Sequence, residues 1–462
     1  MKLRHLIALP LLAVAGCATG PDYQRPDLPV PAAWRTGEPT TNALAELGWA
    51  QLYRDPVLTN LIQVALVNNK DLQIAAARVD EALAAYRIQR AALFPAINAA
   101  GDFTTARVGN LPPAPGAEAD QYNLFGQLSY ELDVWGRVRR VKESALAQAL
   151  ATEDGRRTVQ IGLVASVAST YFNLRALDRQ LEIAQETLAS RSNSLDLTQI
   201  KFDGGNGIVS ELDVAQAETQ VASAQSAIAS LQRQVALTEH ALSVLLGNNP
   251  GQIERGQSLA EQWLPDDLPA GLPSDLLLRR PDVRAAEQQL IAANANIGAA
   301  RAAYFPAISL TGALGLQSED LGDLFDSSLS KAWSFQPSIT APIFNAGRIR
   351  AGVRVAEAQR QGALANYEKS IQNAFREVDD TLVSIARIRE QLIADEAVVK
   401  AERRRLELSN LRYEGGVASF SDVLDAQRFL FSAELTAVQT RNALLNTTVQ
   451  LYKALGGGWN QP

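Results

Sequence analysis

The stretch AALFPAINAAG at Ala91–Gly101 recurs as AAYFPAISLTG at Ala302–Gly312, 211 positions further along the chain. In both copies an alanine-rich pattern typical of a helix runs into Phe-Pro, and apolar and polar residues alternate after the proline. Proline lacks the N–H that a helix requires and biases the preceding residue toward extended geometry. Pro95 and Pro306 therefore each predict a change from helix to strand.

The same offset relates other parts of the chain, which indicates an internal duplication. Gly136-Arg137-Val138-Arg139 matches Gly347-Arg348-Ile349-Arg350, and the same holds for Phe202, Gly204, Gly205 and Ser210 against Tyr413, Gly415, Gly416 and Ser421. One repeat predicts a helix, two strands, a long helix, a turn and a return helix. We expect a first repeat at 49–246, an equatorial linker at 247–281, a second repeat at 282–455 and a C-terminal tail at 456–462.

The composition excludes several classes of function. The 462 residues carry a formal net charge of -7 and no basic stripe interleaved with aromatics, so we expect no nucleic-acid partner. A single Cys rules out a disulfide within one chain. With one Met and two His, the ligands for a soft-metal site are also lacking, and we expect neither a metal nor another cofactor.

The N-terminus has the pattern of a secretory signal. Lys2 and Arg4 precede a short apolar run that ends in Val14-Ala15-Gly16-Cys17. This ending resembles a lipobox, which predicts a signal peptide at 1–16 and lipidation of Cys17; the alternative is an ordinary cleavage site beside a chance cysteine. Ala18 in place of Asp favours the outer membrane, by resemblance to bacterial lipoproteins. The Pro-rich segment 17–48 is expected to be an extended arm.

Four segments alternate between apolar and polar residues, which predicts strands at 96–108, 121–134, 306–317 and 332–344. Their lengths suit tilted membrane strands of about 9–11 residues. Four strands alone would leave two unpaired edges in lipid, so several chains would have to share one closed barrel. Two amphipathic hairpins on a soluble core remain the alternative.

Apolar residues recur every seven positions in the long segment that follows each pair of predicted strands. Examples are Leu174, Leu181 and Leu188 in the first repeat and Ile385, Leu392 and Val399 in the second. This period predicts supercoiled helices, although a globular helix bundle has the same period. The long helix of each repeat is about as long as the two shorter helices of that repeat together. This predicts a tall helical cylinder in which each long helix lies beside two shorter ones stacked end to end, with the linker segments around its middle.

Several motifs together resemble TolC-like outer-membrane efflux factors, specifically the NodT-type lipoprotein branch. They are Cys17 ahead of GPDYQRP, WAQLYRDPVLTNLI at Trp49–Ile62, LLLRRPDVRAAEQQL at Leu276–Leu290, ARAAYFPAISLTG at Ala300–Gly312 and LRYEGGVASFSDVLDAQ at Leu411–Gln427. The resemblance covers essentially the whole chain. It implies an α+β membrane protein whose homotrimer forms a 12-stranded β-barrel on a periplasmic α-helical barrel. It also implies a periplasmic adaptor and an inner-membrane RND-type pump as partners.

The helix hairpins turn at glycines, in DGGNGIVSELD and EGGVASFSDVLD. Glycine suits the end of a helix, and Ser210 and Ser421 are expected to be N-caps. By resemblance to the family, these tips (Gly204, Gly205, Ser210, Gly415, Gly416 and Ser421) dock the adaptor. Ordinary turn chemistry explains the same residues.

Asp422, Asp425 and Arg428 lie three residues apart, on one helical face. In a trimer they would form rings at the narrow pore end, which predicts a cation-preferring periplasmic gate like that of the family. Helix-dipole chemistry alone accounts for Asp422 well and for Asp425 less well. Ser421 stands where related channels can carry a large apolar pore residue, and Phe420 is beside it.

The function expected from these features is passive efflux of drugs or other small toxic compounds across the outer membrane, with the protein extending into the periplasm. The chain shows no nucleotide, nucleophile or metal motif, so we expect no enzyme activity. Two alternatives share much of the pattern: a duct for type I protein secretion, and a lipid-anchored coiled-coil scaffold that forms no channel.

Overall fold

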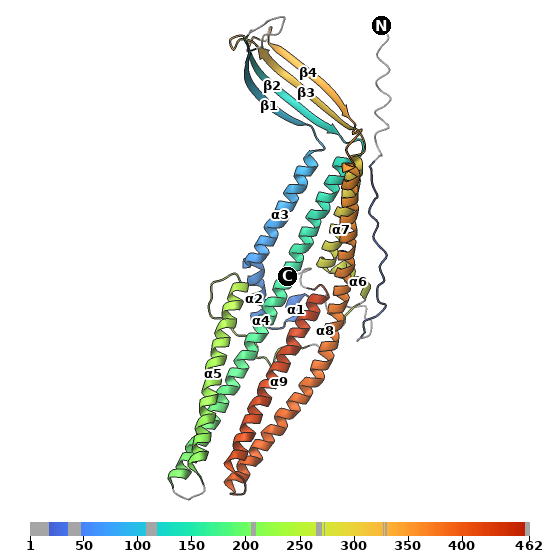
Figure 1. The fold of residues 1–462 in the computed structure, drawn as a ribbon. Coiled ribbons are helices and arrows are strands. Elements are labelled where there is room, and N and C mark those ends of the chain that lie inside the picture. The colour runs from blue at the N-terminus through green and yellow to red at the C-terminus, as the bar shows by residue number, and fades with distance from the viewer. Residues whose placement is uncertain are drawn as a thin grey trace. The chain divides into compact units, whose positions relative to one another are not determined.

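The structure, a computed structural model, describes residues 18–35, 48–107, 118–204, 209–264, 270–271, 273–326, 328 and 330–457 (Figure 1). Cys17 and Gly205 lie outside these ranges. The elements in chain order are α1 (Trp49–Leu52), α2 (Pro56–Asn68), α3 (Lys70–Ala91), β1 (Ala96–Arg107), β2 (Glu118–Leu132), α4 (Arg137–Asp203), α5 (Glu211–Leu245), α6 (Pro273–Arg279), α7 (Pro281–Ala302), β3 (Ala307–Ser318), β4 (Lys331–Thr340), α8 (Arg348–Glu414) and α9 (Phe420–Ala454).

The internal repeat is visible in the element boundaries themselves. An offset of 211 residues carries α3 onto α7, β1 onto β3 and α4 onto α8, from first residue to last. The return helices differ, because α5 and α9 are related by an offset of 209. The turn that precedes α9 is therefore two residues shorter than the turn that precedes α5.

The chain divides into two units, and each of them draws on both repeats. Unit 1 holds the described residues up to Leu28 together with Ala77–Glu153 and Ala285–Lys369. Unit 2 holds the described parts of Pro29–Ala76, Asp154–Arg284 and Ser370–Pro462. The repeats seen in the sequence are thus not separate folding units, since neither repeat makes up a unit alone.

Unit 1 contains one antiparallel sheet with the strand order β1-β2-β3-β4 (Figure 1). Paired residues on neighbouring strands share a face of the sheet. The register therefore gathers the apolar residues on one face, as in Phe103↔Tyr122, Leu124↔Leu316 and Leu314↔Trp333. The other face collects polar residues, as in Asp102↔Asn123 and Thr311↔Gln336. The alternation read from the sequence is confirmed as a two-faced sheet.

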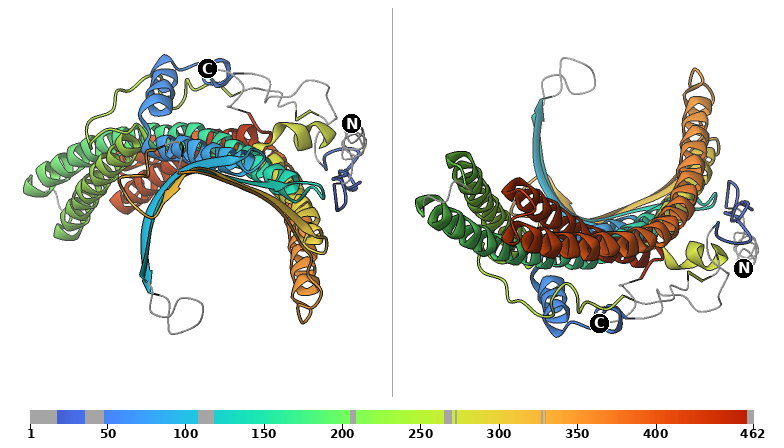
Figure 2. Two further views of the ribbon diagram at one scale, coloured as in Figure 1. Left: turned by 90° about the horizontal axis from the view of Figure 1, so that it is seen from above. Right: turned by 90° about the horizontal axis from the view of Figure 1, so that it is seen from below.

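The apolar face is exposed rather than packed on a core. Leu314, Trp333 and Ile339 are each more than 70% exposed. Figure 2 shows the sheet end-on as a curved layer. Its outer strands β1 and β4 each pair on one side only. Such a sheet needs apolar surroundings for one face and further strands for its edges.

The fourth predicted strand is too long. The sequence predicts a strand at 332–344, but β4 ends at Thr340, and Ile343 and Phe344 lie beyond it, almost fully exposed. β4 ends where its partner strand begins, because Thr340 pairs with Ala307, the first residue of β3, whereas a proline within the strand is tolerated at Pro337. The other three predicted strands agree with the observed ones to within three residues at each end.

The start of the expected arm is fixed to unit 1. The Thr19 backbone N–H donates to the Trp135 carbonyl at 3.0 Å, and Arg140 Nη2 donates to Asp22 at 2.7 Å. Asn294 Nδ2 donates to the Pro21 carbonyl at 2.8 Å. A Cβ on Gly298 would lie only 2.5 Å from the Thr19 carbonyl oxygen, so glycine allows this close approach.

In unit 2, the buried carboxylate of Asp55 joins α2, α4 and the segment after α5. Asp55 caps α2 by accepting from the Val57 N–H at 2.9 Å. Its second oxygen accepts from the Tyr171 hydroxyl at 2.8 Å, the Gln257 N–H at 3.0 Å and Gln262 Nε2 at 2.8 Å. Burial raises the pKa of the Tyr171 hydroxyl, and the hydrogen bond to Asp55 raises it further. The carboxylate thereby fixes residues 256–262 against the helices.

Among the residues that the structure describes, no helix combines the length and the apolar character that a membrane span requires.

Candidate functional site: the helix tips and the gate residues

The first tip, between α4 and α5, is closed by a capping box. Ser210 precedes α5 as its N-cap, and the Asp213 carboxylate accepts from the Ser210 N–H at 2.9 Å and from its hydroxyl at 2.8 Å. Gly204 continues the α4 hydrogen bonding, with its N–H 3.0 Å from the Ile200 carbonyl. The N-cap role predicted for Ser210 is confirmed; Gly205 lies outside the described residues.

The second tip ends α8 with a Schellman motif. Gly416 has the left-handed backbone angle φ of 74°. Its N–H donates to the Tyr413 carbonyl at 3.0 Å, and the Val417 N–H reaches back to Arg412 at 2.9 Å. Gly415 donates to the Leu411 carbonyl at 3.0 Å. Both glycines therefore have the turn role that their sequence predicts.

The N-cap of α9 is Ser419, not Ser421 as the sequence analysis predicts. The Asp422 carboxylate accepts from the Ser419 N–H and hydroxyl, both at 3.2 Å, as Asp213 does in the first tip. Ser421 lies within the first turn of α9 and is exposed. The prediction applied the 211-residue offset to a turn that is two residues shorter, and the offset of 209 instead carries Ser210 onto Ser419.

The two hairpins pack together at their tips in a small apolar cluster. Phe420, Val423 and Leu424 of α9 are buried with Ala217 of α5, and the surrounding side chains are Leu195, Leu406 and Tyr413. The Tyr413 and Phe420 rings are 5.3 Å apart, and Lys201 lies 4.4 Å from the Tyr413 ring centre. Phe420 is therefore core of unit 2, and its side chain is not available as an apolar pore residue.

The three predicted gate residues fall into two groups. Asp422 is engaged in the cap of its own helix. Asp425 and Arg428 form an exposed ion pair, with Arg428 Nη2 3.1 Å from Asp425 Oδ1. The side chains are 50% and 60% exposed, so solvent screening leaves the pair little strength. The Asp425 carboxylate and the Arg428 guanidinium are therefore exposed enough to interact with other charges brought close to them.

Sequence reasoning missed the polar contacts between the hairpins. Gln427 Nε2 donates to Ser194 Oγ at 3.1 Å. Arg191, only 4% exposed, donates to the Gln220 carbonyl of its own hairpin at 2.9 Å and lies 5.5 Å from the Phe431 ring of the other hairpin. Burial lowers the pKa of Arg191. These residues fall outside any local motif, so no signal in the sequence singles them out.

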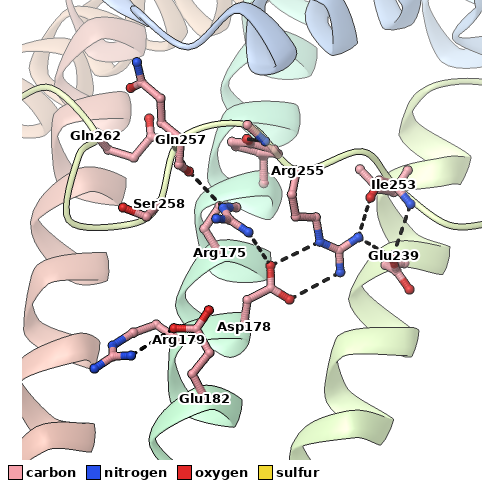
Figure 3. A network of polar contacts seen from close by, with 12 residues as sticks. Arg175, Asp178, Arg179, Glu182, Glu239, Ile253, Arg255, Gln257, Ser258 and Gln262 are labelled. Atoms are coloured by element: carbon pink, nitrogen blue, oxygen red, sulfur yellow. Dashed lines mark hydrogen bonds and ion pairs between the residues drawn. The ribbon is translucent and has the colours of Figure 1, made fainter.

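A larger polar network lies on one face of α4 (Figure 3). Asp178 accepts from Arg175 Nη1 at 2.7 Å and from Arg255 Nε at 3.1 Å. Arg255 also pairs with Glu239 of α5, and Arg175 Nε donates to the Gln257 carbonyl at 2.9 Å. Arg175 and Asp178 of α4 thus contact the segment after α5, which includes residues 253–262.

Within the described ranges, no three His, Cys, Asp or Glu side chains gather as a metal-ion site. The predicted lipidation residue Cys17 lies outside those ranges, one residue before the fixed start of the arm.

The sequence profile for outer membrane efflux proteins matches residues 61–248 and 272–457. SrpC, a solvent efflux pump outer membrane protein of Pseudomonas putida, is 44% identical over 470 residues, covering 100% of this chain and 99% of SrpC. CusC, a cation efflux system protein of Escherichia coli, is 40% identical over 455 residues, covering 97% of each chain.

Solved structures of outer-membrane channels also share the fold of this chain. The open state of the MtrE outer membrane channel of Neisseria gonorrhoeae aligns with a TM-score of 0.87 at 36% identity, over 96% of this chain and 99% of MtrE. The fold is that of outer-membrane channels with a helical barrel and a β-barrel, and the expected fold class is confirmed.

Proposed function

The chain belongs to the outer membrane efflux protein family, and from that premise we propose that three copies form one duct that passively carries drugs or other small toxic compounds out of the cell. The duct works with a periplasmic adaptor and an inner-membrane RND-type pump, and the chain supplies no catalytic chemistry of its own. Relatives named for the efflux of solvents and of cations support export of small compounds over secretion of polypeptides.

The observation that carries this proposal is the sheet of unit 1. One face is apolar and exposed, the other is polar, and both outer strands have an unpaired edge. Lipid would cover the apolar face, and the neighbouring copies would pair with β1 and β4. Three copies supply twelve strands, which exceeds the minimum of about eight for a closed membrane barrel. Lipidated Cys17 would then anchor the arm at the membrane.

The periplasmic gate in this proposal is the ring of Asp425 and Arg428 at the tips. The three Asp425 carboxylates at a narrow end would favour cations, and the Arg428 guanidinium paired with each of them reduces that preference. Asp422 contributes less, because Ser419 already occupies its carboxylate.

Bilayer recording tests the duct and its gate together. The detergent-extracted protein, at three times the 49.8 kDa chain mass, is expected to give a cation-preferring conductance. Asp425→Ala should raise the leak conductance and reduce the preference for cations, because three carboxylates leave the ring. Glu218→Ala, an exposed carboxylate of α5, is the control for general loss of negative charge.

The outcomes separate the two parts of the proposal. A monomer in gentle detergent, or a trimer that conducts nothing, would contradict the duct. A conducting trimer in which Asp425→Ala changes neither leak nor ion preference would contradict only the gate.

The tips carry matching apolar surfaces that suit adaptor docking. Leu197 and Ile200 near the end of α4 are 60% and 67% exposed, and their counterparts at the offset of 211, Leu408 and Leu411 of α8, are 43% and 57% exposed. Exposed apolar pairs at the same place on both hairpins indicate protein contact rather than accidental exposure.

Replacing both Leu197 and Leu408 by Glu is expected to abolish retention of the adaptor and to restore drug sensitivity of cells that depend on this duct. Retention is measured by co-purification in mild detergent. Thr219→Glu adds one glutamate at an exposed polar position of α5 and should leave binding intact. Normal retention by the double variant would place the docking surface elsewhere.

A further inference from the structure

One stretch of helix α4, within unit 2, separates charged from uncharged residues. Between Val159 and Thr187 every charged side chain lies on one side: Arg175, Asp178, Arg179, Glu182 and Glu186. At about 100° per residue, all five fall within a sector of roughly 100° around Glu182. The opposite side carries, at intervals of seven, Val159, Ser166, Asn173, Gln180 and Thr187. This opposite side has no charge over eight turns of helix.

Helix α9 shows the same separation. Between Ser432 and Gln450 the only charged residues are Glu434 and Arg441, seven positions apart and therefore on one side. The opposite side carries Ser432, Gln439 and Asn446, which continue the seven-residue series that begins at Asp425. The gate carboxylate and these uncharged residues therefore share one face of α9.

The segment after α5 identifies the charged face as the outer one. Arg175 donates to the Gln257 carbonyl, and Arg441 Nε donates to the Leu259 carbonyl at 3.0 Å. A groove of about 510 Å³ lies there, lined among others by Arg179, Glu182 and Arg441. Figure 3 shows Arg175 and Asp178 of α4 turned toward this segment, with Arg179 and Glu182 paired with each other below them. An irregular segment inside a duct would obstruct it, so the face that it covers is the outside.

Three asparagines join the two uncharged faces. Asn173 Oδ1 of α4 accepts from Asn442 Nδ2 at 2.7 Å and from Asn446 Nδ2 at 3.0 Å, and Asn446 Nδ2 also lies 3.0 Å from Asn442 Oδ1. Asn173 is exposed, and the bonds leave its own amide N–H groups free to donate. The cluster thus holds amide groups rigidly and presents hydrogen-bond donors without any net charge.

We infer that Asn173, Asn442 and Asn446 line the interior of the duct, as an uncharged contact site for organic solutes that carry hydrogen-bond acceptors. The inference rests on the proposed function and adds a substrate class to it. A solute that has passed the charged ring at Asp425 meets amides and hydroxyls on α4 and α9. This wall can hydrogen-bond to neutral compounds, and it offers no carboxylate or thiolate to retain a metal cation.

Cysteine labelling in planar bilayers tests the assignment of the two faces. Asn173→Cys places a thiol on the uncharged face, and Glu182→Cys, whose parent side chain is 58% exposed on the charged face, is the matched control on the same helix. Each trimer is recorded before and after a cationic methanethiosulfonate reagent, and intact mass confirms the labelling. The only native cysteine is Cys17, and the unmodified parent protein controls for it.

The expected result is a fall in conductance and a loss of cation preference for labelled Asn173→Cys, with no change for labelled Glu182→Cys. Asn173→Asp should shift ion preference in the opposite direction, toward cations, without any label. A conducting channel in which labelling at Asn173→Cys has no effect, or in which Glu182→Cys responds as strongly, overturns the inference. Parent protein without conductance overturns the proposed duct instead.

Discussion

Asp55→Ala is expected to lower the free energy of unfolding by on the order of 4 kcal/mol, because several buried donors lose one shared acceptor. Asp55 is fully buried, and its carboxylate receives the Tyr171 hydroxyl, the Gln257 N–H and the Gln262 amide, in addition to the cap of α2. No other acceptor replaces it in the mutant, so the segment at 256–262 should detach from α2 and α4. Thermal unfolding and limited proteolysis of that segment measure the loss.

Glu254→Ala is the matched control, because it removes an exposed carboxylate from the same segment. We expect its unfolding midpoint to stay close to that of the parent protein. Unchanged protease resistance of Asp55→Ala would show that the carboxylate is dispensable for holding the segment. The unfolding midpoint of Asp55→Asn should fall between those of Asp55→Ala and Glu254→Ala. The amide keeps one accepting oxygen but places a donor among other donors.

Leu314→Arg is expected to prevent stable insertion into the outer membrane. Leu314 is 71% exposed on the apolar face of the sheet, between Gly126 of β2 and Trp333 of β4. An arginine on the lipid face of a barrel costs about 2–4 kcal/mol at the middle of the bilayer. A trimer would incur this cost three times.

Gln127→Arg provides the comparison on the polar face at nearly the same level of the sheet. Gln127 pairs with Ala313, the neighbour of Leu314, and it is exposed on the face that would line the duct. The trimer should be found in outer-membrane fractions for Gln127→Arg and be absent from them for Leu314→Arg. Equal assembly of the two variants would mean that lipid does not cover the apolar face.

Much of the fold could be predicted because its signals are local. Pro95 and Pro306 end α3 and α7 within a few residues, since proline removes a helix donor wherever it stands. The end of the fourth strand was missed, because the alternation continues to 344 whereas pairing with β3 stops at Thr340. The candidate site was predicted less completely. The capping role of Ser210 follows from its sequence, whereas Ser421 was given that role by a repeat offset that does not hold in the second turn.

The duplication, the helix-to-strand changes, the two faces of the strands and the long heptad helices can all be predicted from the residues alone. Each of these depends on residues within about two turns of one another, or on a period repeated many times. The folded chain was needed to show that Ser419 caps α9, that Asp55 contacts Tyr171 and Gln257, and that Arg191 is buried against Phe431. It also revealed the asparagine cluster between α4 and α9. These contacts join residues far apart in the chain, and packing, not local propensity, brings them together.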